Sequence, residues 1–324
     1  MGKNGRIFQE GTAMKKWLCL TVIALLLLSS CSAGRPYKRI SLGAEMSGDK
    51  HDIMETTIVG KTKVENHSIE SYSNMMPVYK ITPRTITREE FQTMADYLGV
   101  QGEINIINNE FRIYGYGYNT QSPTLIGDGN QFSYWCNNGG GETEMTQTDA
   151  ELEAEAWEII NTLPLLEGEY EYVGIASTQQ LKRDSGDIIV AKRLAFRRLI
   201  DGVRVIGNDI CDLYFDSNGL YDIEIKFYDY EKTGELDMLT LDEAVAKIKE
   251  PDAFVLESAT NRNFSGAADK LTVERTKLLF VNRYSDGCEI LQPVYNLMGT
   301  AENTGGSVEF SARIIAIPEK YTHE

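Results

Sequence analysis

Residues 211–227 read CDLYFDSNGLYDIEIKF, and this stretch decides the kind of fold that the chain adopts. Its second half alternates strictly between polar and apolar side chains, in the order Asp222, Ile223, Glu224, Ile225 and Lys226. A period of two is that of a half-buried strand. Asn218-Gly219 is a strong turn signal between two such strands. The run from Asp216 also resembles the start of a calcium loop, but the later ligand positions and the closing Glu are absent, which favours a hairpin.

Three helices are predicted around this strand-rich sequence. Each begins with a Thr followed three residues later by a Glu, at Thr87, Thr148 and Thr240, and these two side chains can cap the free N–H groups of a first helical turn. Gly99 and Pro251 are typical of the ends of the first and the third helix. The sequence therefore predicts short helices between trains of alternating strands.

The second and third helices are each followed by a similar train of strands, which indicates an internal duplication of roughly ninety residues. The expected fold class is α+β, with antiparallel sheets each packed by a helix. Two tandem modules would follow a smaller N-terminal α+β unit. The expected segments are a signal peptide at 1–30, a flexible tether at 31–50, an N-terminal α+β domain at 51–136, a Gly-rich linker at 137–147, a first module at 148–236 and a second at 237–324.

The N-terminus has the order of an export signal. Lys15 and Lys16 precede an apolar run from Leu18 to Leu28, which is too short to cross a bilayer. Translation is expected to begin at Met14. The sequence Leu28-Ser29-Ser30-Cys31 resembles the bacterial lipobox, which implies cleavage before Cys31 and acylation of that cysteine. The alternative is ordinary secretion with an unrelated cysteine. Ser32 follows in place of Asp, and this leaves a Gram-positive surface and an outer membrane both open.

Charge and cysteine content exclude several classes of function. Removing the signal takes four of 32 basic and one of 48 acidic residues, which leaves 28 against 47 and a net charge of −19. A nucleic-acid partner is not expected for such a chain. Cys136, Cys211 and Cys288 have no zinc-like spacing, so no metal or cofactor is expected, and they are interpreted as buried thiols or as one disulfide with a third thiol.

Residues 148–318 resemble two families. The motif Asp-Gly-Val-Arg-Val-Ile-Gly at 201–207, followed by strands that turn at Asn-Gly, is similar to PepSY-like propeptide modules. The helix from Thr240, the strand Phe280–Tyr284 and Leu291-Gln-Pro-Val-Tyr295 resemble the YycH and YycI accessory proteins. The resemblance implies a helix on an antiparallel sheet that acts outside the membrane by contact, inhibiting a protease or restraining a sensor kinase. The chain departs from YycI in having a lipobox where that family keeps a membrane-spanning helix.

No catalytic residues are predicted. The sequence lacks Gly-x-Ser-x-Gly, and no spacing marks two of its many carboxylates as a pair across a cleft. Alternation does place Tyr114, Tyr116 and Tyr118 on one strand face, which is either a sheet core or a binding face for peptide or sugar.

These observations predict a non-enzymatic lipoprotein on the extracytoplasmic face of a cell membrane. It would be held there by lipid and would act as a binding or regulatory module for an envelope protein. The alternatives are a ligand-capture lipoprotein that uses the aromatic face, and an envelope hydrolase.

Overall fold

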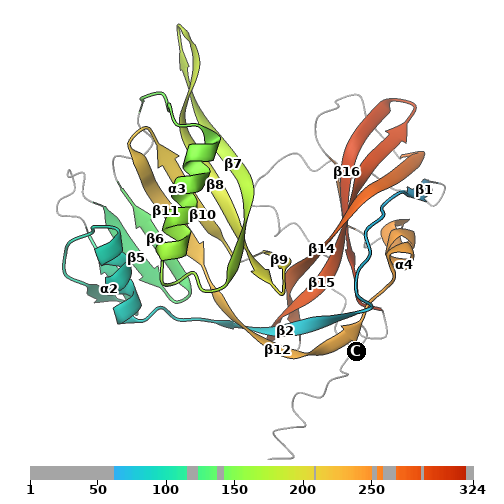
Figure 1. The fold of residues 1–324 in the computed structure, drawn as a ribbon, viewed down its shortest axis with the longest axis horizontal. Coiled ribbons are helices and arrows are strands. Elements are labelled where there is room, and N and C mark those ends of the chain that lie inside the picture. The colour runs from blue at the N-terminus through green and yellow to red at the C-terminus, as the bar shows by residue number, and fades with distance from the viewer. Residues whose placement is uncertain are drawn as a thin grey trace, which may run out of the picture. The chain divides into compact units, whose positions relative to one another are not determined.

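The computed structural model describes residues 62–114, 123–136, 142–207, 209–249, 254–257, 268–285 and 288–318. Within these ranges, sixteen strands form one mixed sheet that carries three α-helices (Figure 1). The helices are α2 (Arg88–Tyr97), α3 (Asp149–Thr162) and α4 (Leu241–Ala246), the last followed by a 3₁₀ turn at Lys247–Lys249. Among the residues described, no helix has the length and apolar composition that a membrane span requires.

The strands cover most of the described chain. Their bounds are β1 (Lys63–Asn66), β2 (Met75–Pro83), β3 (Asn105–Ile107), β4 (Glu110–Ile113), β5 (Thr124–Asp128), β6 (Gln131–Trp135), β7 (Glu169–Arg183), β8 (Gly186–Ile200), β9 (Val203–Ile206), β10 (Cys211–Asp216), β11 (Gly219–Lys226), β12 (Tyr228–Asp237), β13 (Phe254–Glu257), β14 (Lys270–Ser285), β15 (Cys288–Asn303) and β16 (Gly306–Ile315). The main path of hydrogen-bonded neighbours is β12-β2-β15-β14-β9-β8-β10-β11-β6-β5-β4-β3.

Local sequence signals placed several elements correctly. The hairpin predicted at Asn218-Gly219 is confirmed, because β10 and β11 pair antiparallel from Cys211–Ile225 to Asp216–Gly219. All three predicted helix starts are confirmed as capping boxes, in which Thr87, Thr148 and Thr240 each exchange hydrogen bonds with the Glu three residues on. These motifs depend on neighbours in the sequence, so the sequence suffices to predict them.

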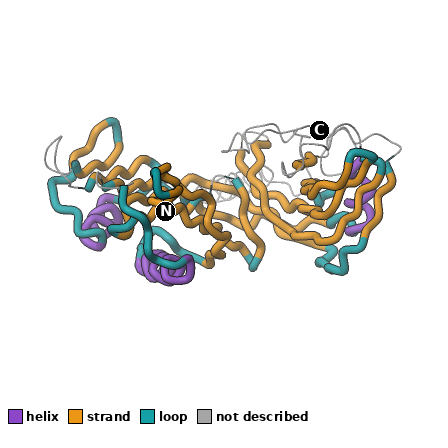
Figure 2. Tube along the Cα trace, turned by 90° about the horizontal axis from the view of Figure 1, so that it is seen from above, coloured by secondary structure: helices purple, strands orange, loops and turns teal. Residues whose placement is uncertain are grey.

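One hydrophobic core lies between α2, α3 and the strands β4, β5, β6, β8, β10 and β11. Phe91 and Met94 of α2 and Leu152 and Ala156 of α3 are buried in it. Figure 2 shows these two helices on the same side of the strands. The other side of the same strands therefore carries the alternate set of side chains.

A second core gathers residues from β2, β9, α4 and β14–β16. It contains Tyr79, Val205, Val245, Phe280 and Tyr295, and the Tyr295 hydroxyl donates a hydrogen bond to the carbonyl of Leu239. The two cores are joined through hydrogen-bonded strands, because β9 pairs with β8 on one side and with β14 on the other.

The predicted fold class is wrong. The sequence led us to expect an α+β protein of tandem modules, each an antiparallel sheet packed by its own helix. The structure is mostly strand, and its strands form a single large mixed sheet with only short helices in the described ranges. The sheet is mixed because β1 and β9 both run parallel to β14. Periodicity identifies strands but not their partners, and the partners decide the class.

The proposed segment boundaries stay a prediction. The signal peptide, the lipobox residues Leu28, Ser29, Ser30 and Cys31, and the tether all lie outside the described residues. Cys136 is partly buried and Cys211 is fully buried, and neither is in a disulfide.

Candidate functional site

The side of the sheet opposite α2 and α3 presents a polar surface, and the alternation of β6 explains why. Phe132 and Tyr134 are buried in the core, so Gln131, Ser133 and Trp135 project to the other side. Trp135 is 52% exposed. It gives this surface a large exposed aromatic side chain, a residue type that is enriched at protein interfaces.

The strands on either side of β6 follow the same rule. On β5, Leu125 and Gly127 face the core and Ile126 and Asp128 face outward. Gly127 lacks a side chain because α2 presses against it: a Cβ there would lie 2.9 Å from Cδ2 of Phe91. On β11, the inward Ile223 and Ile225 leave three outward residues, Asp222, Glu224 and Lys226.

The strand register arranges these outward side chains in three rows. One row is Asp128–Gln131–Lys226. The next is Arg112–Ile126–Ser133–Glu224–Asp212. The third is Thr124–Trp135–Asp222–Tyr214–Arg193. We call these three rows the open face. Neighbours within a row are close enough for their side chains to interact.

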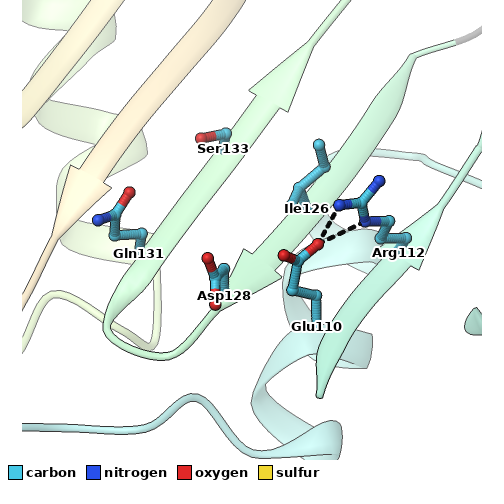
Figure 3. A pocket seen from close by; sticks show the side chains of 6 residues that line it. All are labelled: Glu110, Arg112, Ile126, Asp128, Gln131 and Ser133. Carbon is cyan, nitrogen blue, oxygen red and sulfur yellow. Dashed lines mark hydrogen bonds and ion pairs between the residues drawn. The ribbon is translucent and has the colours of Figure 1, made fainter. Parts of the chain in front are cut away.

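Two adjoining hollows lie on the open face. The first, of ≈ 190 Å³, is lined by Glu110, Arg112, Ile126, Asp128, Gln131 and Ser133, all on the same side of β4, β5 and β6 (Figure 3). The second, of ≈ 240 Å³, is lined by Gln131, Ser133, Ile210, Glu224, Ile225 and Lys226. Both are smaller than the roughly 300–1,000 Å³ of a typical small-molecule site. Each is therefore better suited to a single side chain.

Some charges of the open face neutralise one another. Nε of Arg112 donates to Oε2 of Glu110 at 2.7 Å, as Figure 3 shows, and Nη1 of Arg112 donates to the Tyr114 hydroxyl at 2.9 Å. On the far strands, Nη1 of Arg197 donates to Oδ1 of Asp212 at 2.8 Å. These groups have their charges matched within the molecule.

Other charges of the open face lack such a match. Asp128, Asp222 and Lys226 form no ion pair within the described part of the chain. Glu224 accepts a hydrogen bond from the Tyr214 hydroxyl at 3.0 Å but has no cationic partner there either. Burial, followed by the negative charge of Glu224, raises the pKa of Asp222 to about 7. An acid in this setting would be stabilised by an external cation.

Tyr114 is the one residue of the predicted aromatic face that the structure describes. It is 45% exposed and directly follows β4. Tyr116 and Tyr118 lie outside the described residues. The sequence did not single out Trp135, Asp222 or Glu224 as site residues, although their alternation marked the last two as the polar side of a strand. Trp135 and Asp222 become neighbours because β6 pairs with β11, and the sequence does not reveal this pairing.

A second, buried polar cluster joins Asp209, which lies between β9 and β10, to side chains of β8 and β12. Asp209 is 1% exposed and accepts a hydrogen bond from the Tyr230 hydroxyl at 2.5 Å. The Arg198 guanidinium lies 5.0 Å from the centre of the Tyr230 ring. Burial raises the pKa of Asp209 to about 6. Among the described residues, no three His, Cys, Asp or Glu side chains are grouped to hold a metal ion.

Comparisons with known proteins add little to this geometry. No family model matches the chain. No curated protein matches it either. Among solved structures, the chain is similar to the crystal structure of YycH from Bacillus subtilis, with 11% identity and a TM-score of 0.33 over 72% of this chain. The match spans 57% of the length of YycH.

Proposed function

We propose that this chain is an extracytoplasmic lipoprotein that binds an envelope protein through the open face and does not act as an enzyme. The observation that carries the proposal is the combination on adjacent strands of unmatched charges, an exposed tryptophan and two side-chain-sized hollows. Aromatic residues in a polar surround are typical of protein interfaces. A surface with shallow hollows recognises projecting side chains better than it encloses a small molecule.

The membrane anchor in this proposal depends on the lipobox at Leu28–Cys31. Each buried methylene of an acyl chain contributes about 0.8 kcal/mol, and two or three chains hold a protein at a membrane where one does not. Mass measurement of the membrane-extracted protein tests whether Cys31 carries lipid. We expect the lipid mass on the wild type and its loss in Cys31→Ala. A lipid-modified Cys31→Ala protein would refute the anchor.

The expected partner is a protease or a sensor kinase. This expectation comes from the resemblance of residues 148–318 to PepSY-like modules and to YycH and YycI, whose members act by contact outside the membrane. The high negative charge of the chain is compatible with such a role and argues against nucleic acid.

Capture from membranes tests the use of the open face. Ser133 lines both hollows, so Ser133→Arg would place a long charged side chain where they adjoin. Ala154→Arg is the matched control, because Ala154 is exposed on α3 on the other side of the sheet. We expect cross-linked partner recovered with the Ser133→Arg protein to fall about tenfold, as for a central interface residue. Equal recovery with both variants would contradict the proposal.

Capture of a peptide or sugar is a second candidate function, and the exposure of Tyr114 favours it. Tyr114→Ala should then weaken binding of the ligand while it leaves the stability of the fold unchanged. Binding of glycan or peptide arrays by the wild type, lost in Tyr114→Ala, would support this candidate. Binding that survives the substitution would exclude Tyr114 from the site.

A further inference from the structure

We infer that Asp222, between Trp135 and Tyr214 on the open face, binds a cationic side chain, arginine or lysine, of the protein partner. This inference rests on the proposed function and names the chemistry of the group that the open face recognises. Trp135, Asp222 and Tyr214 are successive members of one row on β6, β11 and β10. Neighbouring strands are about 4.8 Å apart, so Trp135 and Tyr214 flank Asp222 on the two adjacent strands.

The geometry around Asp222 supports this assignment. Tyr214 is held toward Glu224 by the hydrogen bond from its hydroxyl at 3.0 Å. Glu224 lies two residues from Asp222 on the same side of β11, about 7 Å along the strand. A guanidinium or ammonium group could therefore contact the Asp222 carboxylate, with Glu224 near enough to add attraction and Trp135 offering an aromatic face.

The charges that face Asp222 point to a cation as well. The outward side chains of β5, β6 and β11 carry three carboxyl groups, Asp128, Asp222 and Glu224, against the single cation Lys226, a local charge of −2 when Asp222 is ionised. On β10 and β8, Asp212 already interacts with Arg193 and Arg197. None of these arginines, nor Lys226, is among the groups that influence Asp222.

Titration of Asp222 gives the inference a distinctive signature. Burial and the nearby Glu224 raise its pKa to about 7, so the group is partly protonated at neutral pH. A bound cation favours the charged carboxylate and lowers this pKa. Binding at pH 7 must therefore release a proton, and the affinity should rise as the pH increases from 6 to 8.

Calorimetric titration of the full chain in detergent tests the inference. The probe is acetyl-Gly-Arg-Gly-amide, and its control is the same peptide with citrulline, the neutral analogue of arginine. We expect the arginine peptide to bind about tenfold more tightly, in keeping with the strength of hydrogen bonds to charged groups. Repeating the titration in phosphate and in Tris at pH 7 should reveal proton release. Equal affinity for both peptides, or no binding up to about 10 mM, would overturn the inference.

Two variants separate the site from general attraction by an acidic protein. Asp222→Asn should weaken binding of the arginine peptide about tenfold and abolish proton release. Glu158→Gln removes an exposed carboxylate from α3, on the other side of the sheet, and should change the affinity less than about twofold. Circular dichroism would verify that both variants fold. Equal losses in the two variants would refute the role of Asp222.

The proposed function can survive failure of this inference. If partner capture depends on Ser133 but the arginine peptide does not bind, the open face binds its partner by other chemistry. If the peptide binds as expected and capture does not depend on Ser133, the cation site stands without the proposed interface.

Discussion

Asp209 shows how burial sets the chemistry of a single residue. The carboxyl group is almost inaccessible to solvent, and its hydrogen bond from Tyr230 and the positive charge of Arg198 only partly offset the loss of water. Its pKa therefore rises from 3.8 to about 6. The folded state consequently holds this proton more tightly than the unfolded chain does.

The unfolding free energy should depend on pH because of Asp209. Between pH 4 and pH 6 the folded protein binds more protons than the unfolded chain, so its stability falls as the pH rises through that window. The rise in the pKa of Asp209 corresponds to a change of about 3 kcal/mol in the free energy of unfolding. Asp209→Asn keeps an oxygen that can accept from Tyr230 but removes the titration. We expect the free energy of unfolding of this variant to exceed that of the wild type by about 1–3 kcal/mol at pH 8 and to be almost equal to it at pH 4.

Urea unfolding at both pH values measures this difference. Asp128→Asn serves as the control, because Asp128 is exposed. A gain for Asp209→Asn that is the same at pH 4 and at pH 8 would contradict the account. The sequence could not have indicated this residue, since the groups that interact with Asp209 come from β8 and β12, and one of them, Tyr230, is 21 positions away.

At the scale of elements, the β14–β15 pair contains an irregularity that only glycine accommodates. The register shifts between Val273 and Arg275, so Glu274 is an extra residue opposite Gly299 and Met298. A Cβ on Gly299 would lie 1.8 Å from the carbonyl oxygen of Thr272, which is backbone and cannot move aside without disturbing the strand. The bulge therefore requires glycine at this position.

Gly299→Ala should destabilise the protein by at least about 2 kcal/mol, because the added methyl group overlaps backbone in a packed sheet. Gly234→Ala in β12 is the matched control, since a Cβ there meets nothing within 4 Å. We expect the control to change stability by less than about 0.5 kcal/mol. Thermal unfolding of both variants measures the difference in their stability. Similar unfolding midpoints for the two variants would argue against the bulge at Gly299.

Elements that depend on near neighbours could be predicted from the sequence, and contacts between distant elements could not. The Thr-x-x-Glu motifs fixed the three helix starts, and Asn218-Gly219 fixed the β10–β11 hairpin. The open face is different. Its rows join residues 124–135 to residues 222–226, and nothing in either segment specifies that β6 pairs with β11. The alternation therefore identified polar side chains but not the surface that they form.

At the scale of the whole molecule, long-range pairing explains why the expected fold class was wrong. Strand β2, near the start of the described chain, pairs with β12 and with β15. Strand β9 joins β8 to β14 and so continues one sheet where separate modules were expected. The duplication suggested by similar strand trains therefore does not produce independent sheets.

Fragments test how the cores are divided along the chain. The core around α2 and α3 uses residues from 86 to 227, on both sides of the predicted linker at 137–147. We expect a fragment of residues 84–227 to unfold cooperatively. A fragment of residues 148–236 lacks α2 and β4–β6 and should not fold, because the apolar faces of its strands remain uncovered. Cooperative unfolding of the shorter fragment would instead support the predicted boundary.

The most direct test of the account is a residue-specific photo-cross-link in intact membranes. Benzoylphenylalanine would replace Trp135 on the open face and, in a second protein, Tyr97 at the end of α2 on the other side of the sheet. The two native side chains are comparably exposed, at 52% and 40%. The account predicts that irradiation joins an envelope protein to position 135 and not to position 97. Cross-links at position 97 alone, or at neither position, would contradict it.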